Sequence, residues 1–87
     1  MMAKKHDRTL AAIFARPTRA NVAWNDVVAL VEHLGGAVYA DRGGSPREFL
    51  LNGVRAVFHE PHPQKEIPQA MVRRLRIYLE EAGIDYP

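Results

Sequence analysis

The sequence predicts an α+β fold in which helices cover one face of a three-stranded antiparallel sheet, in the order α-α-β-β-β-α. Three segments carry apolar residues at helical spacing, and three short strand-like runs lie together between the second and the third of these segments. Helices packed on one side of an antiparallel sheet bury a single hydrophobic layer. The opposite face of the sheet is then expected to stay open.

Each helix is marked at one end by a residue type that starts or stops helices. Asp7 is the N-cap candidate of the first helix, and Asn25 or Asp26 is that of the second. Gly35 follows the second helix, and Gly83 follows the third as its C-terminal cap. The helices are expected over residues 8–15, from 24–26 to 34, and from 68 to about 82.

The strands are placed by a turn signal. Asn52-Gly53 supplies the two positive-φ positions of a type I′ turn, so residues 47–51 and 54–59 are expected to form a hairpin. A first strand is expected over residues 37–42, joined to the hairpin by a GGSP loop. Because side chains alternate along a strand, Arg55 and His59 are expected to share the open face of the sheet.

Composition limits the classes of function. The 87 residues are enough for one domain, and the absence of cysteine excludes disulfides and thiolate metal sites, which leaves the cytoplasm as the default location. The apolar run near the N-terminus is too short for a signal peptide or a membrane span, so no membrane contact is expected. A pI near 9.3 is a weak indication of an anionic partner.

Candidate chemistry is concentrated in the loop that follows the third strand. His59 ends that strand, Pro61 and Pro63 hold His62 in extended backbone, and Lys65 follows. Imidazoles near a lysine suit a phosphate, so His59 and His62 are the candidate acid–base groups; the alternative for His62 is an exposed loop histidine with no catalytic role. The His-x-x-His spacing lacks a third ligand, so no metal or cofactor is expected.

Further residues are candidates for binding a phosphate backbone. Gly44-Ser45 can present backbone N–H groups to a phosphate, or can simply form a turn. Arg47 and Arg55 lie on neighbouring hairpin strands and can meet a phosphodiester backbone, or can pair across the strands with Glu48 or Glu60.

Basic residues near and within the last helix have similar alternatives. Lys65 and the amides near Ile67 approach a helix N-terminus and form a second candidate phosphate site, the alternative being a solvated lysine. Three arginines of the last helix are interpreted as its polar face, with contact to RNA or to a partner protein as the alternative. They are Arg73, Arg74 and Arg76.

Four short motifs occur along the chain: Leu34-Gly35-Gly36, Gly44-Ser45, Pro61-His62 with Lys65-Glu66-Ile67, and Ala82-Gly83-Ile84. Their order and spacing resemble those of the HicA-type toxins, the small ribonucleases of bacterial toxin–antitoxin pairs. The resemblance covers roughly residues 24–84, so a single domain over 1–87 is expected, with an N-terminal extension over 1–20 that carries a short helix and a core over 24–84.

The resemblance implies a double-stranded-RNA-binding-like fold, cleavage of messenger RNA without a metal, and silencing by a HicB-like antitoxin. It also implies a catalytic histidine after the Gly-Ser pair, where this chain has Pro46. Proline cannot transfer a proton, so either His59 or His62 has taken over that role or the site only binds. Two functions follow: an RNA-binding toxin with endoribonuclease activity, or a catalytically inactive RNA- or protein-binding module on the same fold.

Overall fold

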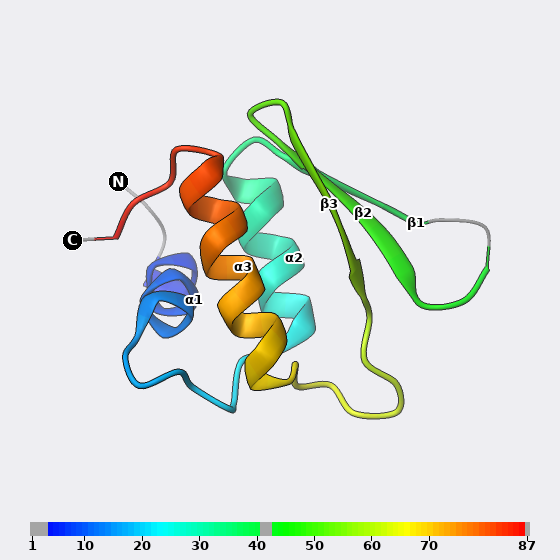
Figure 1. Ribbon diagram of the computed structural model, residues 1–87, viewed down its shortest axis with the longest axis horizontal. Helices are drawn as coiled ribbons and strands as arrows, with labels where there is room; N and C mark the ends of the chain where they lie inside the picture. The colour runs from blue at the N-terminus through cyan, green and yellow to red at the C-terminus, as the bar shows by residue number, and fades with distance from the viewer. Residues whose placement is uncertain (1–3, 41–42, 87) are drawn as a thin grey trace.

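Three helices lie on one side of a three-stranded antiparallel sheet, as predicted (Figure 1). The computed structural model describes residues 4–40 and 43–86. The elements in chain order are α1 (Lys4–Phe14), α2 (Trp24–His33), β1 (Ala37–Ala40), β2 (Pro46–Leu51), β3 (Val54–His59) and α3 (Gln69–Glu81). This order confirms the predicted α+β, double-stranded-RNA-binding-like arrangement.

The helices form two layers. Helices α2 and α3 lie between the sheet and α1, so α1 packs against these two helices on the side away from the strands (Figure 1). Leu10 and Ile13 of α1 are buried at this contact. The N-terminal helix therefore extends the hydrophobic core without touching the sheet face.

The sheet has the order β1-β2-β3, and its hairpin turn is the predicted one. Asn52 and Gly53 both have positive φ, at 51° and 81°, as a type I′ turn requires. The Asn52 side chain also donates a hydrogen bond of 2.7 Å to the carbonyl of Ala82, just after α3. This contact ties the tip of the hairpin to the end of the last helix.

Aromatic side chains fill the centre of the core. Phe49 of β2 is fully buried and makes edge-to-face contacts with three other rings. The ring-centroid distances are 5.6 Å to Trp24, 4.9 Å to Phe58 and 6.2 Å to Tyr78. One phenylalanine thus links α2, β3 and α3.

The N-caps of the first two helices differ from the predicted ones. Asp7 is not the N-cap of the first helix, because α1 already includes Lys4 and Asp7 lies in its first turn. Neither Asn25 nor Asp26 caps α2, whose N-cap is Ala23 without a side-chain hydrogen bond. The amide of Trp24 instead donates to the carbonyl of Lys65 at 2.9 Å, so a backbone contact between distant segments replaces the side-chain cap.

The strand starts also differ slightly. Pro46 belongs to β2 and not to the preceding loop, and β1 is observed over Ala37–Ala40, with the rest of its predicted range outside the described residues. Gly36 leads into β1 at a close approach, where an added Cβ would lie 2.6 Å from the carbonyl oxygen of Leu50. Only glycine fits there, and this sets the distance between the end of α2 and the sheet.

Arg76 is not part of the polar face of α3, contrary to the prediction. Its side chain is buried, and its guanidinium donates to the carbonyls of Ile13 and Ala15 and to the Thr18 hydroxyl, at 3.0, 3.2 and 3.1 Å. Carbonyls at the end of a helix have no partner within that helix. Arg76 therefore supplies the missing donors at the C-terminal end of α1.

In the part of the chain that the structure describes, each helix is too short or too polar to cross a membrane.

Candidate functional site

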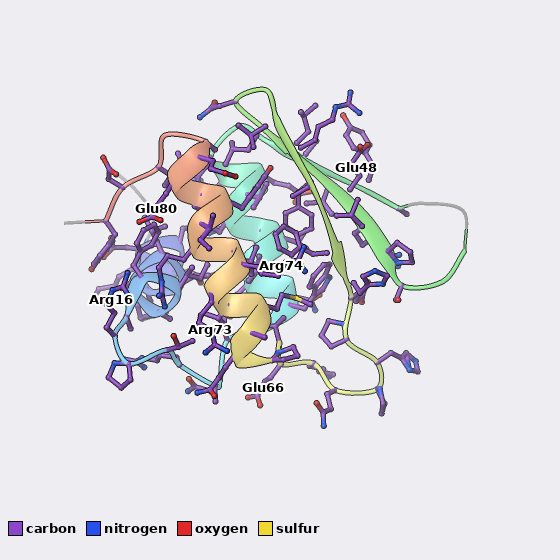
Figure 2. All side chains as sticks on the ribbon, viewed as in Figure 1. Arg16, Glu48, Glu66, Arg73, Arg74 and Glu80 are labelled. Carbon is purple, nitrogen blue, oxygen red and sulfur yellow. The ribbon has the colours of Figure 1, made fainter. Side chains whose placement is uncertain are left out.

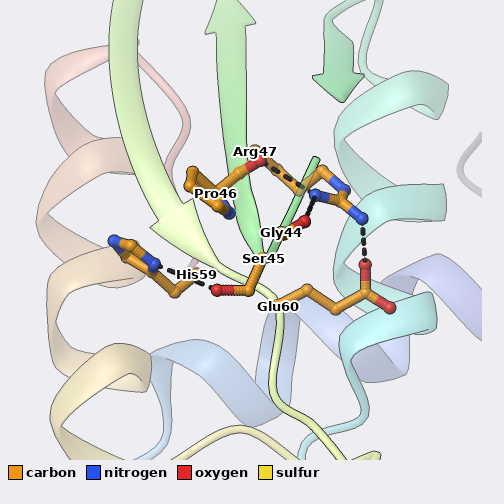
Figure 3. Close-up of polar contacts among 6 residues, drawn as sticks. All are labelled: Gly44, Ser45, Pro46, Arg47, His59 and Glu60. Atoms are coloured by element: carbon orange, nitrogen blue, oxygen red, sulfur yellow. Dashed lines mark hydrogen bonds and ion pairs between the residues drawn. The ribbon is translucent and has the colours of Figure 1, made fainter. Parts of the chain in front are cut away.

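Some of the candidate residues meet where β2 begins and β3 ends, among them Ser45, Arg47 and His59 (Figure 3). The loop residues Gly44 and Ser45 precede β2, and Glu60 to His62 follow β3. The amide of Glu60 donates to the carbonyl of Ser45 at 2.8 Å, which continues the strand ladder into both loops. The β-sheet thus holds two irregular segments side by side.

Pro46 and His59 face each other across the two strands in the register of the sheet. The hydrogen bond between Glu60 and Ser45 closes the neighbouring pair, so Pro46 and His59 form a non-hydrogen-bonded pair, the type in which side chains approach most closely. Pro46 and His59 also alternate with Arg47 and Phe58, which lie toward the helices. The two side chains therefore stand next to each other on the open face.

His59 has one recorded side-chain contact among the described residues. Its Nδ1 lies 3.3 Å from the Oγ of Ser45, and which of the two donates depends on the tautomer (Figure 3). The imidazole is exposed, so Nε2 is open to a ligand. Ser45 thus contacts Nδ1 of the ring and leaves Nε2 without this contact.

Arg47 joins the two loops from the other side of the strand (Figure 3). Its Nη1 donates to the carbonyls of Gly44 and Pro46 at 2.8 and 2.9 Å, and its Nη2 lies 3.2 Å from Oε1 of Glu60. A cavity of about 330 Å³ lies here, lined by Gly44, Ser45, Arg47, Glu60, Pro61 and His62. His62 therefore shares a cavity with Ser45 and Arg47.

Arg55 and Lys65 lie outside this cavity. Arg55 is on the open face, as predicted from its alternation, and pairs with Glu48 at 3.1 Å. Arg47 and Arg55 thus occupy opposite faces of the hairpin, and each has the glutamate partner that the sequence offered as the alternative to a phosphate. Lys65 is exposed and lines another groove, together with Ala20, Gln64 and residues 66–69.

The amide of Ile67 is not available to a phosphate. It donates to the carbonyl of Val22 at 2.9 Å, in a short antiparallel contact that also pairs Ala23 with Glu66. The second candidate phosphate site therefore keeps the side chain of Lys65 but loses the Ile67 amide.

Residues 24–84, more than half of the 87-residue chain, match the family described as HicA toxin of bacterial toxin-antitoxin. The chain belongs to the HicA toxin family. A search of curated proteins and a search of solved structures each gave no significant match. The matched range begins at the first residue of α2, so α1 and the segment after it precede the part that defines the family.

One relation in this HicA-family site was missed from the sequence. Pro46 lies six positions before Asn52, and His59 lies six positions after Gly53. A two-residue turn makes such positions cross-strand partners, so the turn signal alone was enough to find the pair. Within the described residues no cluster of three or more histidine or acidic side chains is placed to hold a metal ion.

Proposed function

We propose that this HicA-family chain is a toxin that binds messenger RNA and cleaves it without a metal, with His59 acting in place of the histidine absent at position 46. The observation that carries the proposal is the cross-strand pairing of Pro46 with His59. A histidine side chain at position 46 would project from the same face, so His59 presents an imidazole to the same region from the adjacent strand.

The chemistry needs a base and an acid near one phosphodiester. The RNA 2′-hydroxyl loses its proton to the base and attacks the adjacent phosphorus, which forms a cyclic phosphate and breaks the bond to the 5′-oxygen; the acid then protonates that oxygen. His59 suits the base when its Nδ1–H donates to Ser45, because Nε2 then carries a lone pair. His62, in the cavity beside Ser45, suits the acid.

The arginines and Lys65 suit the binding of the phosphates. Arg47 and Arg55 are held by glutamates in partly exposed ion pairs, which contribute only about 0–1 kcal/mol each. A phosphate can therefore replace Glu48 or Glu60 as the partner at little cost. Gly44 and Ser45 border the cavity with their backbone, and Lys65 adds a charge in the next groove.

A HicB-like antitoxin is the proposed protein partner. The open face of the sheet carries two large exposed apolar side chains, Tyr39 and Val57, which face Glu48 from either side of β2. Tyr39 and Val57 are the apolar contacts that this face offers to a protein partner. A partner on this face would also cover His59.

The experiment is a cleavage assay on purified protein with a chelator present. The wild type should cleave RNA, and His59→Ala and His62→Ala should each lower the rate by about 10²–10⁴-fold, the usual contribution of a general base or acid. His33→Ala is the matched control, because His33 is exposed near the end of α2 and should leave the rate unchanged. Full activity in the His59 variant would refute its role.

A gain of activity tests the same idea in the opposite direction. Pro46→His places a second imidazole beside His59, at the position where the family has its histidine. Faster cleavage by this variant than by the wild type is the expected result. Expression without the antitoxin should also arrest growth, and normal growth together with intact RNA removes the enzymatic part of the proposal.

The second candidate function is a catalytically inactive binding module, and Pro46 is the observation that favours it. Such a module would leave RNA intact but could still bind it. If the module binds the RNA backbone, the logarithm of its RNA affinity should fall linearly with the logarithm of the salt concentration. A module that binds only protein partners would show no RNA affinity at any salt concentration.

A further inference from the structure

We infer that the groove between α1 and the segment before α2 is a second binding surface for the RNA backbone, an inference that rests on the proposed function. The groove has a volume of about 320 Å³ and is lined by residues of α1, of the first turn of α2 and of the connection between them. Its cations are Lys5, Arg8 and Arg19. All three precede the range that matches the HicA family.

The charge of the groove is positive and largely uncompensated. Asp26 supplies the one carboxylate among the described residues that line it, and it lies 3.9 Å from the Nζ of Lys5, with both side chains well exposed. Across residues 4–40 and 43–86 no ion pair is recorded for Arg8 or for Arg19, and both are exposed. Two guanidinium groups are thus available in one groove, and guanidinium binds phosphate in a bidentate fashion.

The start of α2 adds to this potential. The helix begins with Trp24, directly after Ala23, which lines the groove. The positive end of the helix dipole therefore lies at the edge of the same groove. The dipole of α2 therefore adds to the attraction of an anion that Arg8 and Arg19 bind.

The groove lies near the loop that carries Lys65. The segment before α2 lies beside the loop before α3, because Ile67 donates to Val22 and Trp24 donates to Lys65, both at 2.9 Å. Figure 1 shows these two segments meeting at the lower edge of the molecule, where α2 and α3 both begin. Ala20, the residue after Arg19, and Lys65, three positions after His62, line one groove. A single RNA strand can therefore pass from His62 over Lys65 to Arg19 and Arg8.

The position of the groove is fixed by the core. Arg76 holds the end of α1 and Thr18 in place, and Gln69 donates to the carbonyl of Thr18 at 2.9 Å. The connection that carries Arg19 is thus attached to α3 at two points. A preorganised surface loses less conformational freedom when it binds a flexible strand.

The test is the salt dependence of binding to a single-stranded RNA of about 20 nucleotides, followed by fluorescence anisotropy at several salt concentrations. Each lost phosphate contact lowers the slope of log affinity against log salt by about 0.7, which is about 5-fold in affinity at 0.1 M salt. The double variant Arg8→Gln/Arg19→Gln should therefore bind about 25-fold more weakly, with a slope smaller by about 1.4.

Arg16→Gln is the matched control. Arg16 is an exposed arginine of the same connection, it lines none of the described grooves, and Figure 2 shows it on the far side of α1 from the RNA-cleaving site. Its variant should bind as the wild type does. Unchanged binding by the double variant, with a wild type that binds RNA, refutes the groove and leaves the proposed function standing. A wild type that does not bind RNA refutes both.

Discussion

The stability of the fold is predicted to depend on Arg76, a cation buried against the end of another helix. The variant Arg76→Met keeps an unbranched apolar stem but removes all three hydrogen bonds to α1 and the connection after it. The carbonyl of Ile13 is then left buried without a donor, whereas the groups of Ala15 and Thr18 are partly exposed and can turn to water.

The size of the effect follows from these environments. A buried acceptor without a partner costs about 1–3 kcal/mol, and each of the other two bonds contributes about 0.5–1.5 kcal/mol. We therefore expect the free energy of unfolding to fall by about 2–6 kcal/mol. A domain of this length has a total of about 4–13 kcal/mol, so the loss is a large fraction of the whole. The melting temperature should fall by at least about 8 °C.

Urea unfolding monitored by tryptophan fluorescence measures the effect directly. Trp24 is the single tryptophan and is only 4% exposed, so its emission reports the opening of the core. The midpoint should decrease at an unchanged slope. Arg73→Met is the control, because Arg73 is exposed on the same helix and its loss should change stability by less than about 0.5 kcal/mol. If the two variants unfold at the same midpoint, the argument for Arg76 is wrong.

Three further predictions test other contacts. Gly36→Ala should lower the free energy of unfolding by about 1–3 kcal/mol, because its Cβ would collide with the backbone of Leu50; an unchanged urea midpoint contradicts this packing. The ring of His6 stacks on the ring of His33, with ring centroids 4.3 Å apart. Desolvation lowers the pKa of His6 most, the charges of His33 and Lys5 lower it further, and Asp26 acts in the opposite direction. Because the pKa of His6 is lower in the folded chain, the unfolded chain binds a proton first as the pH falls, and wild-type stability should decrease below pH 6.5. His6→Phe should reduce this pH dependence of stability in melting curves between pH 5 and 7.5. Burial raises the pKa of Tyr78 to about 12, and its hydroxyl donates to Val54 at 3.0 Å, so Tyr78→Phe should lower stability by about 0.5–1.5 kcal/mol at neutral pH and weaken the loss of stability above pH 10.

Local signals were sufficient to predict the strands and the approximate helices. Asn52-Gly53 determines its own backbone conformation, and with it the hairpin register, the shared face of Arg55 and His59, and the pairing of Pro46 with His59. Gly35 and Gly83 end α2 and α3 with positive φ, as their positions indicated.

Contacts between distant segments were beyond such signals. A helix N-cap normally comes from a neighbouring side chain, but the amide of Trp24 uses a carbonyl from the loop before α3. Arg76 has the sequence spacing of a polar helix position, and its burial depends on carbonyls more than fifty residues earlier in the chain. Likewise, Glu48 and Glu60 could be seen in the sequence, but whether Arg47 and Arg55 pair with them depends on which face of the sheet each side chain takes.

The pairing at the start of β2 has an evolutionary consequence. Because residue 46 sits in a non-hydrogen-bonded pair with His59, the ladder between β2 and β3 makes no use of the amide hydrogen that proline lacks. Two of the four proline codons differ from a histidine codon by a single base. For such codons, exchange of proline and histidine at this place is one mutational event that leaves the backbone ladder of the hairpin intact.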